Sequence, residues 1–251
     1  MVQVMPGCEA WSAEGGDAGV LVLHGFTGNP SSMRPLAEAL ADRGFAVELP
    51  RLPGHGTRWQ CLQKTTWHDW VREVVAAFET LRARTRARVV VGLSGGGALA
   101  LYLAETRGEH LSGLTLVNPW LYHTDPLRVL VPVVKWVLPA VPGVGNDIAK
   151  PGADEQPYPK APLKAASSFM AFQRRVRAHL PEVTAPILLF SSRQDHVFDP
   201  EKNSRLLLEG IASSDVDHIW LERSYHVATL DYDADEIEER TAAFVARVTA
   251  P

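Results

Sequence analysis

The sequence predicts an α/β fold in which a mostly parallel sheet is covered by helices on both faces. Short continuous apolar runs alternate with segments whose apolar residues recur at helical spacing, over residues 20–118 and again over 187–248. The chain has 251 residues, of which 46% are hydrophobic, so it can bury the core of one large domain. We therefore expect a single domain over residues 1–251.

The expected strands are continuous apolar runs, which are typical of strands buried on both faces. They lie at 20–23, 45–49, 87–93, 114–118, 187–191 and 218–221. The expected helices have apolar residues three and four positions apart. They lie at 31–43, 67–83, 95–106, 200–209 and 235–248. The first of them begins at Ser31 and Ser32, which are good N-caps, and ends before Gly44, a typical helix stop.

Residues 119–186 interrupt this alternation. They contain many prolines, no convincing core strand, and short amphipathic pieces such as 167–179. We interpret residues 120–182 as an insertion beside the sheet. The most hydrophobic run, 129–144, is too short to span a bilayer and is interrupted by Lys135 and by prolines. We expect it to form an apolar surface element, with no stable membrane anchor.

Composition excludes several classes of protein. Lys and Arg total 25 against 29 for Asp and Glu, so the net charge of −4 provides no basic field for a nucleic-acid partner. Two isolated cysteines, Cys8 and Cys61, make neither a zinc site nor a disulfide framework. The polar N-terminal segment does not resemble a signal peptide, so we expect a cytoplasmic protein. Metal-binding and nucleotide-binding motifs are absent from the sequence, and we expect no cofactor.

The strongest local signal is the G-x-S-x-G pattern at residues 92–96, GLSGG, between an expected strand and an expected helix. A sharp turn of this kind lifts the Ser94 hydroxyl above the edge of the sheet, where a base can take its proton. Glycines suit the turn because side chains would collide there. We expect Ser94 to be a nucleophile. The alternative is a plain glycine-rich turn.

Acyl transfer also needs two N–H donors that face the oxyanion. The sequence HGFTG (24–28) follows the first expected strand, and we expect the donors to be the backbone N–H groups of Phe26 and Gly95. Two histidines lie early in the chain and are interpreted as structural. His24 is expected to hydrogen-bond within its loop, and His55 to order the turn LPGHG.

The base and the acid are expected later in the chain, in the order Ser, acid, His. His226 lies in a short loop after the last strand. Asp195 lies at the tip of the loop after the preceding strand, and we favour it over Asp199, which precedes a proline and is typical of a helix N-cap. Asp231 and Asp233 are expected to be solvated residues at the entry to the final helix.

These motifs together resemble the α/β-hydrolase superfamily. The combination of HGFTG, RLPGHGT (51–57), GLSGGG and SYHVATLDYD (224–233) is similar to bacterial monoacylglycerol lipases and related thermostable carboxylesterases. The resemblance implies an α/β-hydrolase fold with a small lid, the triad of Ser94, Asp195 and His226, and oxyanion donors Phe26 and Gly95. It also implies substrate contacts from Phe26, Val144, Glu155 and Val197. The chain departs from these relatives at Gly95, where they usually carry Met.

We expect a serine esterase that cleaves monoacylglycerols to glycerol and free fatty acid through an acyl-enzyme on Ser94. One alternative is a general short-chain carboxylesterase, and another is a ligand-binding sensor without hydrolysis. The apolar segment 127–138 is expected to cover an acyl tunnel and to contact lipid transiently, or else simply to pack on the core. Glu155 is expected either to bind glycerol hydroxyls or to be solvated.

Overall fold

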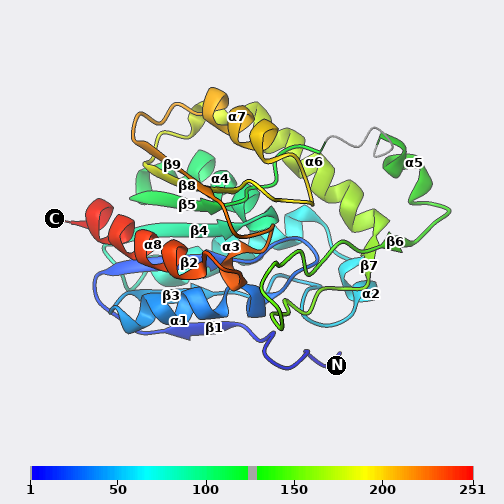
Figure 1. Cartoon of the computed structure of the whole chain (residues 1–251), viewed down its shortest axis with the longest axis horizontal. Coiled ribbons are helices and arrows are strands. Elements are labelled where there is room, and N and C mark those ends of the chain that lie inside the picture. Colours follow the sequence, from blue (N-terminus) through cyan, green and yellow to red (C-terminus); the bar gives the residue numbers. More distant parts are fainter. Residues whose placement is uncertain (1, 124–128, 251) are drawn as a thin grey trace.

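The structure is a computed structural model that describes residues 2–123 and 129–250. Its centre is a seven-stranded sheet (Figure 1). The strands are β1 (Trp11–Ala13), β2 (Ala18–Leu23), β3 (Ala46–Leu49), β4 (Ala87–Leu93), β5 (Gly113–Val117), β8 (Ile187–Ser192) and β9 (Val216–Leu221). Six of these correspond to the six strands expected from apolar runs, and the α/β class is confirmed.

The strand order is β1-β3-β2-β4-β5-β8-β9. All neighbouring pairs are parallel except β1 and β3. In the central pairs, Val20 lies opposite Val89, and Val90 lies opposite Leu114. Because the parallel strands point the same way, their carboxyl ends meet at one edge of the sheet. That edge is where ligands bind in open α/β sheets.

The antiparallel strand β1 was not expected from the sequence. It has only three residues, and none of them is fully buried. A short edge strand of this kind carries no apolar run, since it only covers the edge of β3.

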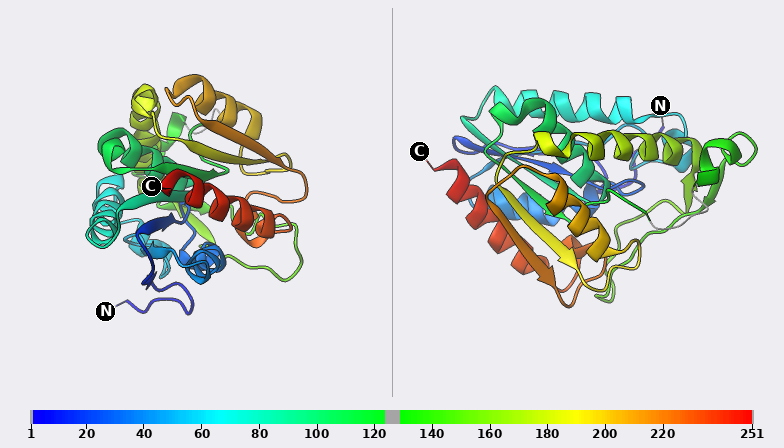
Figure 2. Two further views of the ribbon diagram at one scale, coloured as in Figure 1. Left: turned by 90° about the vertical axis from the view of Figure 1, so that its left-hand side faces the viewer. Right: turned by 90° about the horizontal axis from the view of Figure 1, so that it is seen from above.

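Alternate strand residues build two separate cores, as the period of two in a strand requires. Leu21 and Leu23 face one core, whereas Val20 and Val22 face the other. The first core is completed by α3 (Trp67–Arg82) and α4 (Gly95–Arg107), and the second by α1 (Arg34–Asp42) and α8 (Ala234–Thr249). The left view of Figure 2 shows the sheet between these helix layers.

The helices expected outside the insertion are all present, with ends shifted by a few residues. The fourth of them is α7 (Pro200–Gly210), and a short helix α2 (Trp59–Leu62) is additional. The first helix starts later than expected, because residues 30–32 form a separate 3₁₀ turn whose N-cap is Asn29. Such differences at helix ends are common, since terminal turns are often 3₁₀.

The insertion follows β5 and contains α5 (Val131–Val134), the paired strands β6 (Ala140–Pro142) and β7 (Lys160–Pro162), and α6 (Leu163–His179). Figure 1 shows α5 at the far end of the molecule, away from the sheet. In contrast, α6 belongs to the body, because Phe169, Phe172 and Val176 are buried in the first core. Residues 127–128 of the expected apolar segment 127–138 lie outside the described residues.

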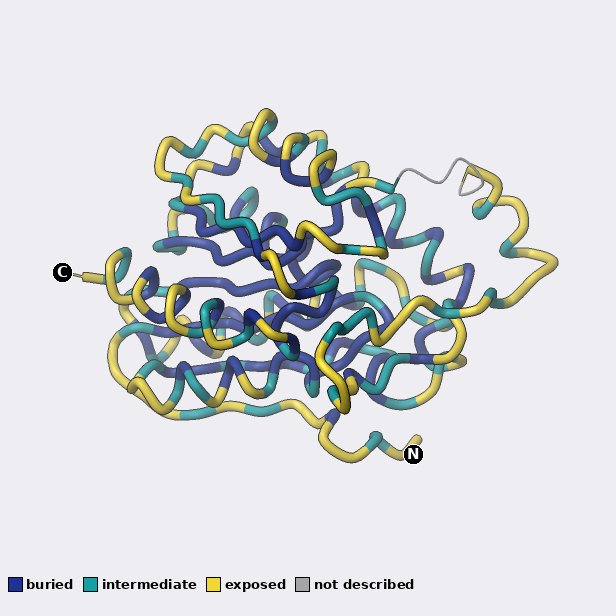
Figure 3. The backbone as a smooth tube through the Cα atoms, in the orientation of Figure 1, coloured by how far each residue is buried: buried dark blue, intermediate teal, exposed yellow. Residues whose placement is uncertain are grey.

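Most of the apolar element 129–144 is exposed, as Figure 3 illustrates for the region around α5. Val133, Trp136 and Val137 retain 71%, 74% and 90% of their surface. The expectation of an apolar surface element is therefore confirmed for these residues. Among the helices that the structure describes, none combines the length and the apolar character needed to cross a bilayer.

Candidate active site

Ser94 occupies a strained turn between β4 and α4. Its backbone adopts φ 54° and ψ −115°, a left-handed conformation that L-residues rarely adopt. The surrounding structure holds the turn in place, since the Ser94 N–H donates to Val117 O (2.9 Å) and its carbonyl accepts from the N–H groups of Gly97 and Trp120. The turn places Ser94 at the carboxyl end of the sheet and at the start of a helix.

Two glycines make this turn possible. A Cβ on Gly92 would lie 2.4 Å from Gly96 O, and a Cβ on Gly96 would lie 2.3 Å from Leu23 O in β2. Both distances are far below any real contact, so the chain can approach itself and the neighbouring strand only because these residues lack side chains. The glycines at both ends of GLSGG are therefore required by packing.

The HGFTG loop lies directly against Ser94. A Cβ on Gly25 would be 3.2 Å from Ser94 Cβ and 3.6 Å from its Oγ. On the other side, a Cβ on Gly95 would be 2.8 Å from the Phe26 nitrogen. The two backbone N–H groups expected as oxyanion donors, those of Phe26 and Gly95, thus belong to segments in close contact beside the Ser94 hydroxyl. Phe26 is held there by stacking on Phe169 of α6, with ring centroids 5.1 Å apart.

Asp195 and His226 are brought together from two different loops. Asp195 follows β8 and His226 follows β9, and the His226 Nδ1–H donates to Asp195 Oδ2 at 2.7 Å. The Asp195 side chain is completely buried, and its Oδ1 accepts from the N–H groups of Val197 and Phe198. The bond fixes the ring orientation of His226, so that Nε2 is the nitrogen left available for proton transfer.

The environment raises the pKa of His226 above its ordinary value. Burial is the largest single influence and opposes this, because it disfavours the charged imidazolium, but the charge and hydrogen bond of Asp195 and the charges of Glu155 and Asp147 together outweigh it. Glu155 and Asp147 add negative charge from the insertion. This arrangement stabilises the imidazolium that forms when a base accepts a proton.

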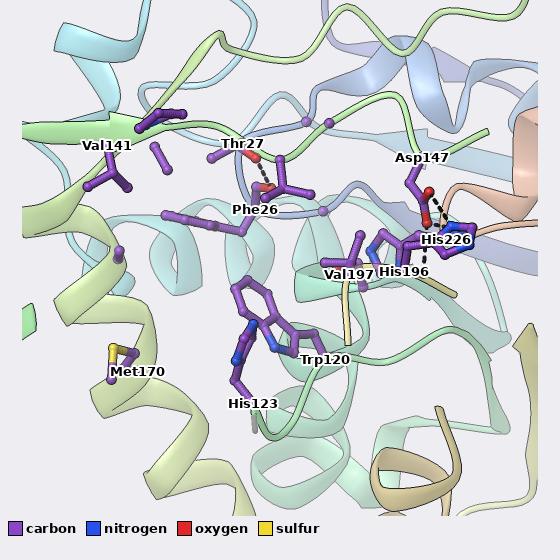
Figure 4. Close-up of a pocket in the computed structure, with 18 of the residues that line it drawn as sticks. Phe26, Thr27, Trp120, His123, Val141, Asp147, Met170, His196, Val197 and His226 are labelled. Atoms are coloured by element: carbon purple, nitrogen blue, oxygen red, sulfur yellow. Dashed lines mark hydrogen bonds and ion pairs between the residues drawn. The ribbon is translucent and has the colours of Figure 1, made fainter. Parts of the chain in front are cut away.

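Ser94 and His226 line the same cavity, which has a volume of about 490 Å³. Figure 4 shows this cavity in close-up, with His226 among the labelled residues. One part of its wall is apolar and comes largely from the insertion. This part includes Leu130, Val131, Val134, Val141, Leu163 and Met170. Among the described residues, no hydrogen bond joins the Ser94 hydroxyl to the His226 ring. In enzymes without bound substrate such contacts are often long, and they tighten when the substrate binds.

The four residues that the family resemblance assigns to substrate contact all line this cavity: Phe26, Val144, Glu155 and Val197. Glu155 is not solvated, because only 8% of it is exposed and its Oε1 accepts from the Asn146 N–H at 2.9 Å. Burial raises the pKa of its carboxyl group. The buried carboxylate therefore marks a polar part of a largely apolar cavity.

The two early histidines are structural in their contacts, as expected. His24 Nδ1 donates to Gly25 O, and its Nε2 accepts from the Leu52 N–H. Burial lowers the pKa of His24 to about 4, which keeps the ring neutral. His55 is also buried and donates from Nδ1 to Pro53 O. Neither ring is part of the cavity wall that contains Ser94.

The acidic residues near the two loops differ from expectation in one respect. Asp199 caps α7 by accepting from the Lys202 N–H, which confirms its interpretation as an N-cap. The expectation that Asp231 and Asp233 are solvated is wrong, because they are 1% and 3% exposed. Each accepts hydrogen bonds from backbone N–H groups and orders the loop around His226. Their sequence position before a helix suggested solvation, whereas loop packing buries them.

Asn118, at the end of β5, is a structural residue of the site that the sequence analysis missed. Its Nδ2 donates to His226 O at 2.8 Å and to Ser192 Oγ at 2.9 Å, and its Oδ1 accepts from the Ser192 N–H. It adopts a left-handed φ of 43°. The one available signal was a polar residue directly after a buried strand, at the edge where the site lies.

Two further histidines, His123 and His196, line the cavity and were not expected there. In the part of the chain that the structure describes, no three side chains of His, Cys, Asp or Glu are grouped to hold a metal ion.

The chain is similar to known proteins along most of its length. A sequence model of the family "Serine aminopeptidase, S33" matches residues 16–233. The chain is 39% identical to a thermostable monoacylglycerol lipase of Bacillus sp. (strain H-257), over 97% of this chain and 96% of that protein. It is 25% identical to a carboxylesterase of Bacillus subtilis (strain 168), over 94% and 95% of the two chains.

Among solved structures, one reported with LipS and LipT, two metagenome-derived lipolytic enzymes, superposes with a TM-score of 0.94. It is 40% identical to this chain and covers 98% of this chain and 100% of that chain. The superposition covers nearly the whole chain, so the α/β-hydrolase fold expected from the motifs is confirmed. With a family match over most of its length and relatives at 39–40% identity, the chain belongs to the serine aminopeptidase S33 family of α/β-hydrolases.

Proposed function

We propose that this protein is a serine hydrolase of carboxylic esters, with Ser94 as nucleophile, His226 as general base and Asp195 as the residue that orients His226. The observation that carries the proposal is the buried 2.7 Å bond between His226 and Asp195, at a cavity that also contains Ser94 on a strained turn. A nucleophile, a base and an orienting acid are the three parts that serine-mediated acyl transfer requires.

The reaction follows from these positions. The Ser94 hydroxyl attacks the ester carbonyl while His226 takes its proton, and Asp195 stabilises the resulting imidazolium. The N–H groups of Phe26 and Gly95 bind the oxyanion. His226 then protonates the leaving alcohol. Water, activated by the same histidine, attacks the acyl group on Ser94 and releases the carboxylic acid.

The preferred substrate is proposed to be a monoacylglycerol, which the enzyme cleaves to glycerol and fatty acid. A cavity of about 490 Å³ with a largely apolar wall can hold a single acyl chain. Each buried methylene contributes roughly 0.8 kcal/mol, so a chain of about ten carbons supplies several kcal/mol of binding. Buried Glu155 supplies acceptor oxygens near the cavity for the hydroxyls of the alcohol part. The 39% identical relative is named a monoacylglycerol lipase.

The insertion, residues 120–182, is proposed to supply a lid over the cavity: α6 anchors it in the body, and its exposed part around α5 contacts lipid transiently. Leu130 and Val134 line the cavity, while Val133, Trp136 and Val137 point outward and are largely exposed, so the apolar surface continues from the cavity to the outside. The ammonium groups of Lys135 and Lys164 lie over the Trp136 ring. Apolar side chains among cationic groups favour an anionic lipid surface. The Val133→Ser, Val137→Ser double variant should bind less to phosphatidylglycerol vesicles in a sedimentation assay.

A cytoplasmic location is also proposed. Its support is that Cys8 and Cys61 are both unpaired thiols in the structure, which suits a reducing compartment.

The second candidate is a general short-chain carboxylesterase, which the 25% identity to the Bacillus subtilis carboxylesterase favours. Hydrolysis of monoacylglycerols and of p-nitrophenyl esters, each with acyl chains from two to sixteen carbons, separates the two. The monoacylglycerol proposal predicts an optimum at about eight carbons or more, because apolar burial grows with chain length. An optimum at two to four carbons would favour the short-chain enzyme. Ester binding without turnover would favour the sensor alternative.

A further inference from the structure

Within the insertion, residues 143–148 form irregular backbone that contacts the loops carrying Asp195 and His226. Asn146 adopts a left-handed φ of 55°. Its backbone N–H donates to Glu155 Oε1, and its own Oδ1 accepts from the Glu155 N–H, both at 2.9 Å. These two reciprocal bonds hold Asn146 against Glu155. The backbone just before Asp147 is therefore held in place.

Asp147 contacts both loops that carry the proposed acid and base. Its Oδ2 accepts from the N–H groups of His196 and His226, each at 3.1 Å. Its Oδ1 lies 2.9 Å from His196 Nδ1, and its backbone carbonyl accepts from the Val227 N–H. Figure 4 shows Asp147 above His196 and His226, joined to both by dashed lines. One carboxylate thus bridges the residue after Asp195 and the backbone of His226.

We propose that Asp147 is a positioning residue that holds the Asp195 loop and the His226 loop in register for proton transfer. The inference rests on the proposed function of Ser94, His226 and Asp195. The two loops follow different strands, so their alignment depends on contacts between them. The His226 peptide is clamped on its N–H by Asp147 and on its carbonyl by Asn118. Because catalysis depends on orientation, a shift of about 1 Å at His226 can cost about a hundredfold in rate.

Asp147 also acts on His226 through its charge. The groups that face the His226 ring are Asp195 and His196 from the loop after β8, and Asp147 and Glu155 from the insertion. The Asp147 side chain is only 14% exposed, so water screens its charge weakly. Its negative charge stabilises the imidazolium and contributes to the raised pKa of His226. Removing that charge should lower this pKa.

The test compares Asp147→Ala and Asp147→Asn with wild-type protein, with kcat and KM for a soluble p-nitrophenyl ester measured from pH 5 to 9. Asp147→Ala removes the clamp, and its kcat should fall about ten- to a hundredfold. In Asp147→Asn the side chain keeps its shape and one acceptor oxygen. Its kcat at the pH plateau should therefore be much closer to the wild-type value than that of Asp147→Ala. Its acid limb should still move to lower pH, because the charge is gone. Thermal melting confirms that each variant is folded.

Asp215→Asn is the matched control. The Asp215 carboxylate pairs with Arg247 of α8 and directly precedes β9. His226 follows the opposite end of that strand. This variant should leave kcat and the pH profile unchanged. A purely structural Asp147 would lower the melting temperature without moving the acid limb, and that result would overturn the inference. So would wild-type kcat and pH profile in both Asp147 variants.

Failure of the proposed function looks different. In that case Ser94→Ala would hydrolyse the ester as fast as wild type, whatever the Asp147 variants do. If Ser94→Ala is inactive and the Asp147 variants behave like wild type, only the inference about Asp147 is wrong.

Discussion

The Nδ1 atom of His226 lies 2.7 Å from Oδ2 of Asp195, and the two side chains are 9% and 0% exposed. The bond joins residues from two separate loops, and burial excludes competing water. Charge-assisted hydrogen bonds of this kind are about twice as strong as neutral ones. The pair therefore holds the imidazole in one orientation and in the tautomer whose Nε2 can accept a proton.

Asp195→Asn should test this role. An amide that faces Nδ1 stabilises the wrong tautomer and no longer compensates the imidazolium, so kcat should fall by about 10⁴-fold with little change in KM. Steady-state kinetics on a p-nitrophenyl ester measure the effect. Asp199→Ala is the control in the same loop. It removes the N-cap of α7 and an ion pair with Lys202 on the surface, so it should cost about 1 kcal/mol of stability and leave kcat near the wild-type value.

The pH dependence of hydrolysis should report the raised pKa of His226. The base works only when it is neutral, so activity should fall as pH drops through that pKa. Because Asp195 raises the pKa above the ordinary value of 6.5, the midpoint of the acid limb in kcat/KM should lie above pH 6.5. A midpoint clearly below pH 6.5 would contradict the electrostatic account of the site.

Gly95 gives a prediction specific to this chain. A Cβ at this position would lie 2.8 Å from the Phe26 nitrogen and 3.2 Å from the Phe169 ring, so Gly95→Ala must displace the HGFTG loop or the helix start. Loss of one oxyanion donor typically lowers kcat by about 10²–10³-fold, and a displaced donor should cost at least about tenfold. The relevant measurement is kcat for Gly95→Ala.

Gly108→Ala, at the other end of α4, is the matched control for Gly95→Ala. Nothing lies within 4 Å of its added Cβ, so this variant should leave kcat unchanged. Equal kcat for the two variants would refute the tight contact beside Ser94.

Asp231 should be important for stability, contrary to its sequence context. Its carboxylate accepts from the N–H groups of Ala149, Lys150, Tyr225 and Tyr232. Asp231→Ala leaves these donors without their acceptor, and each unsatisfied buried donor costs about 1–3 kcal/mol. Urea unfolding should show a loss above about 3 kcal/mol. Asp235→Ala, an exposed change in the first turn of α8, should cost only a few tenths of a kcal/mol.

The sequence predicted what depends on local pattern. Buried strands such as 87–93 are continuous apolar runs, and the GLSGG pattern stands between such a strand and a helix. β1 was missed because three half-exposed residues carry no such pattern. Asp231, Asp147 and Asn118 act through contacts between segments up to 108 positions apart. Nothing in their local sequence indicates burial, since polar residues in loops are more often solvated.

The central claim is that Ser94 and His226 act together in the cavity. A crystal structure of the protein treated with a covalent serine-reactive phosphonate tests it most directly. The account predicts a bond from Ser94 Oγ to phosphorus, a phosphoryl oxygen within hydrogen-bond distance of the Phe26 and Gly95 nitrogens, and His226 Nε2 facing the adduct. Modification of another residue, or an adduct on Ser94 with the His226 ring turned away from it, would contradict the account.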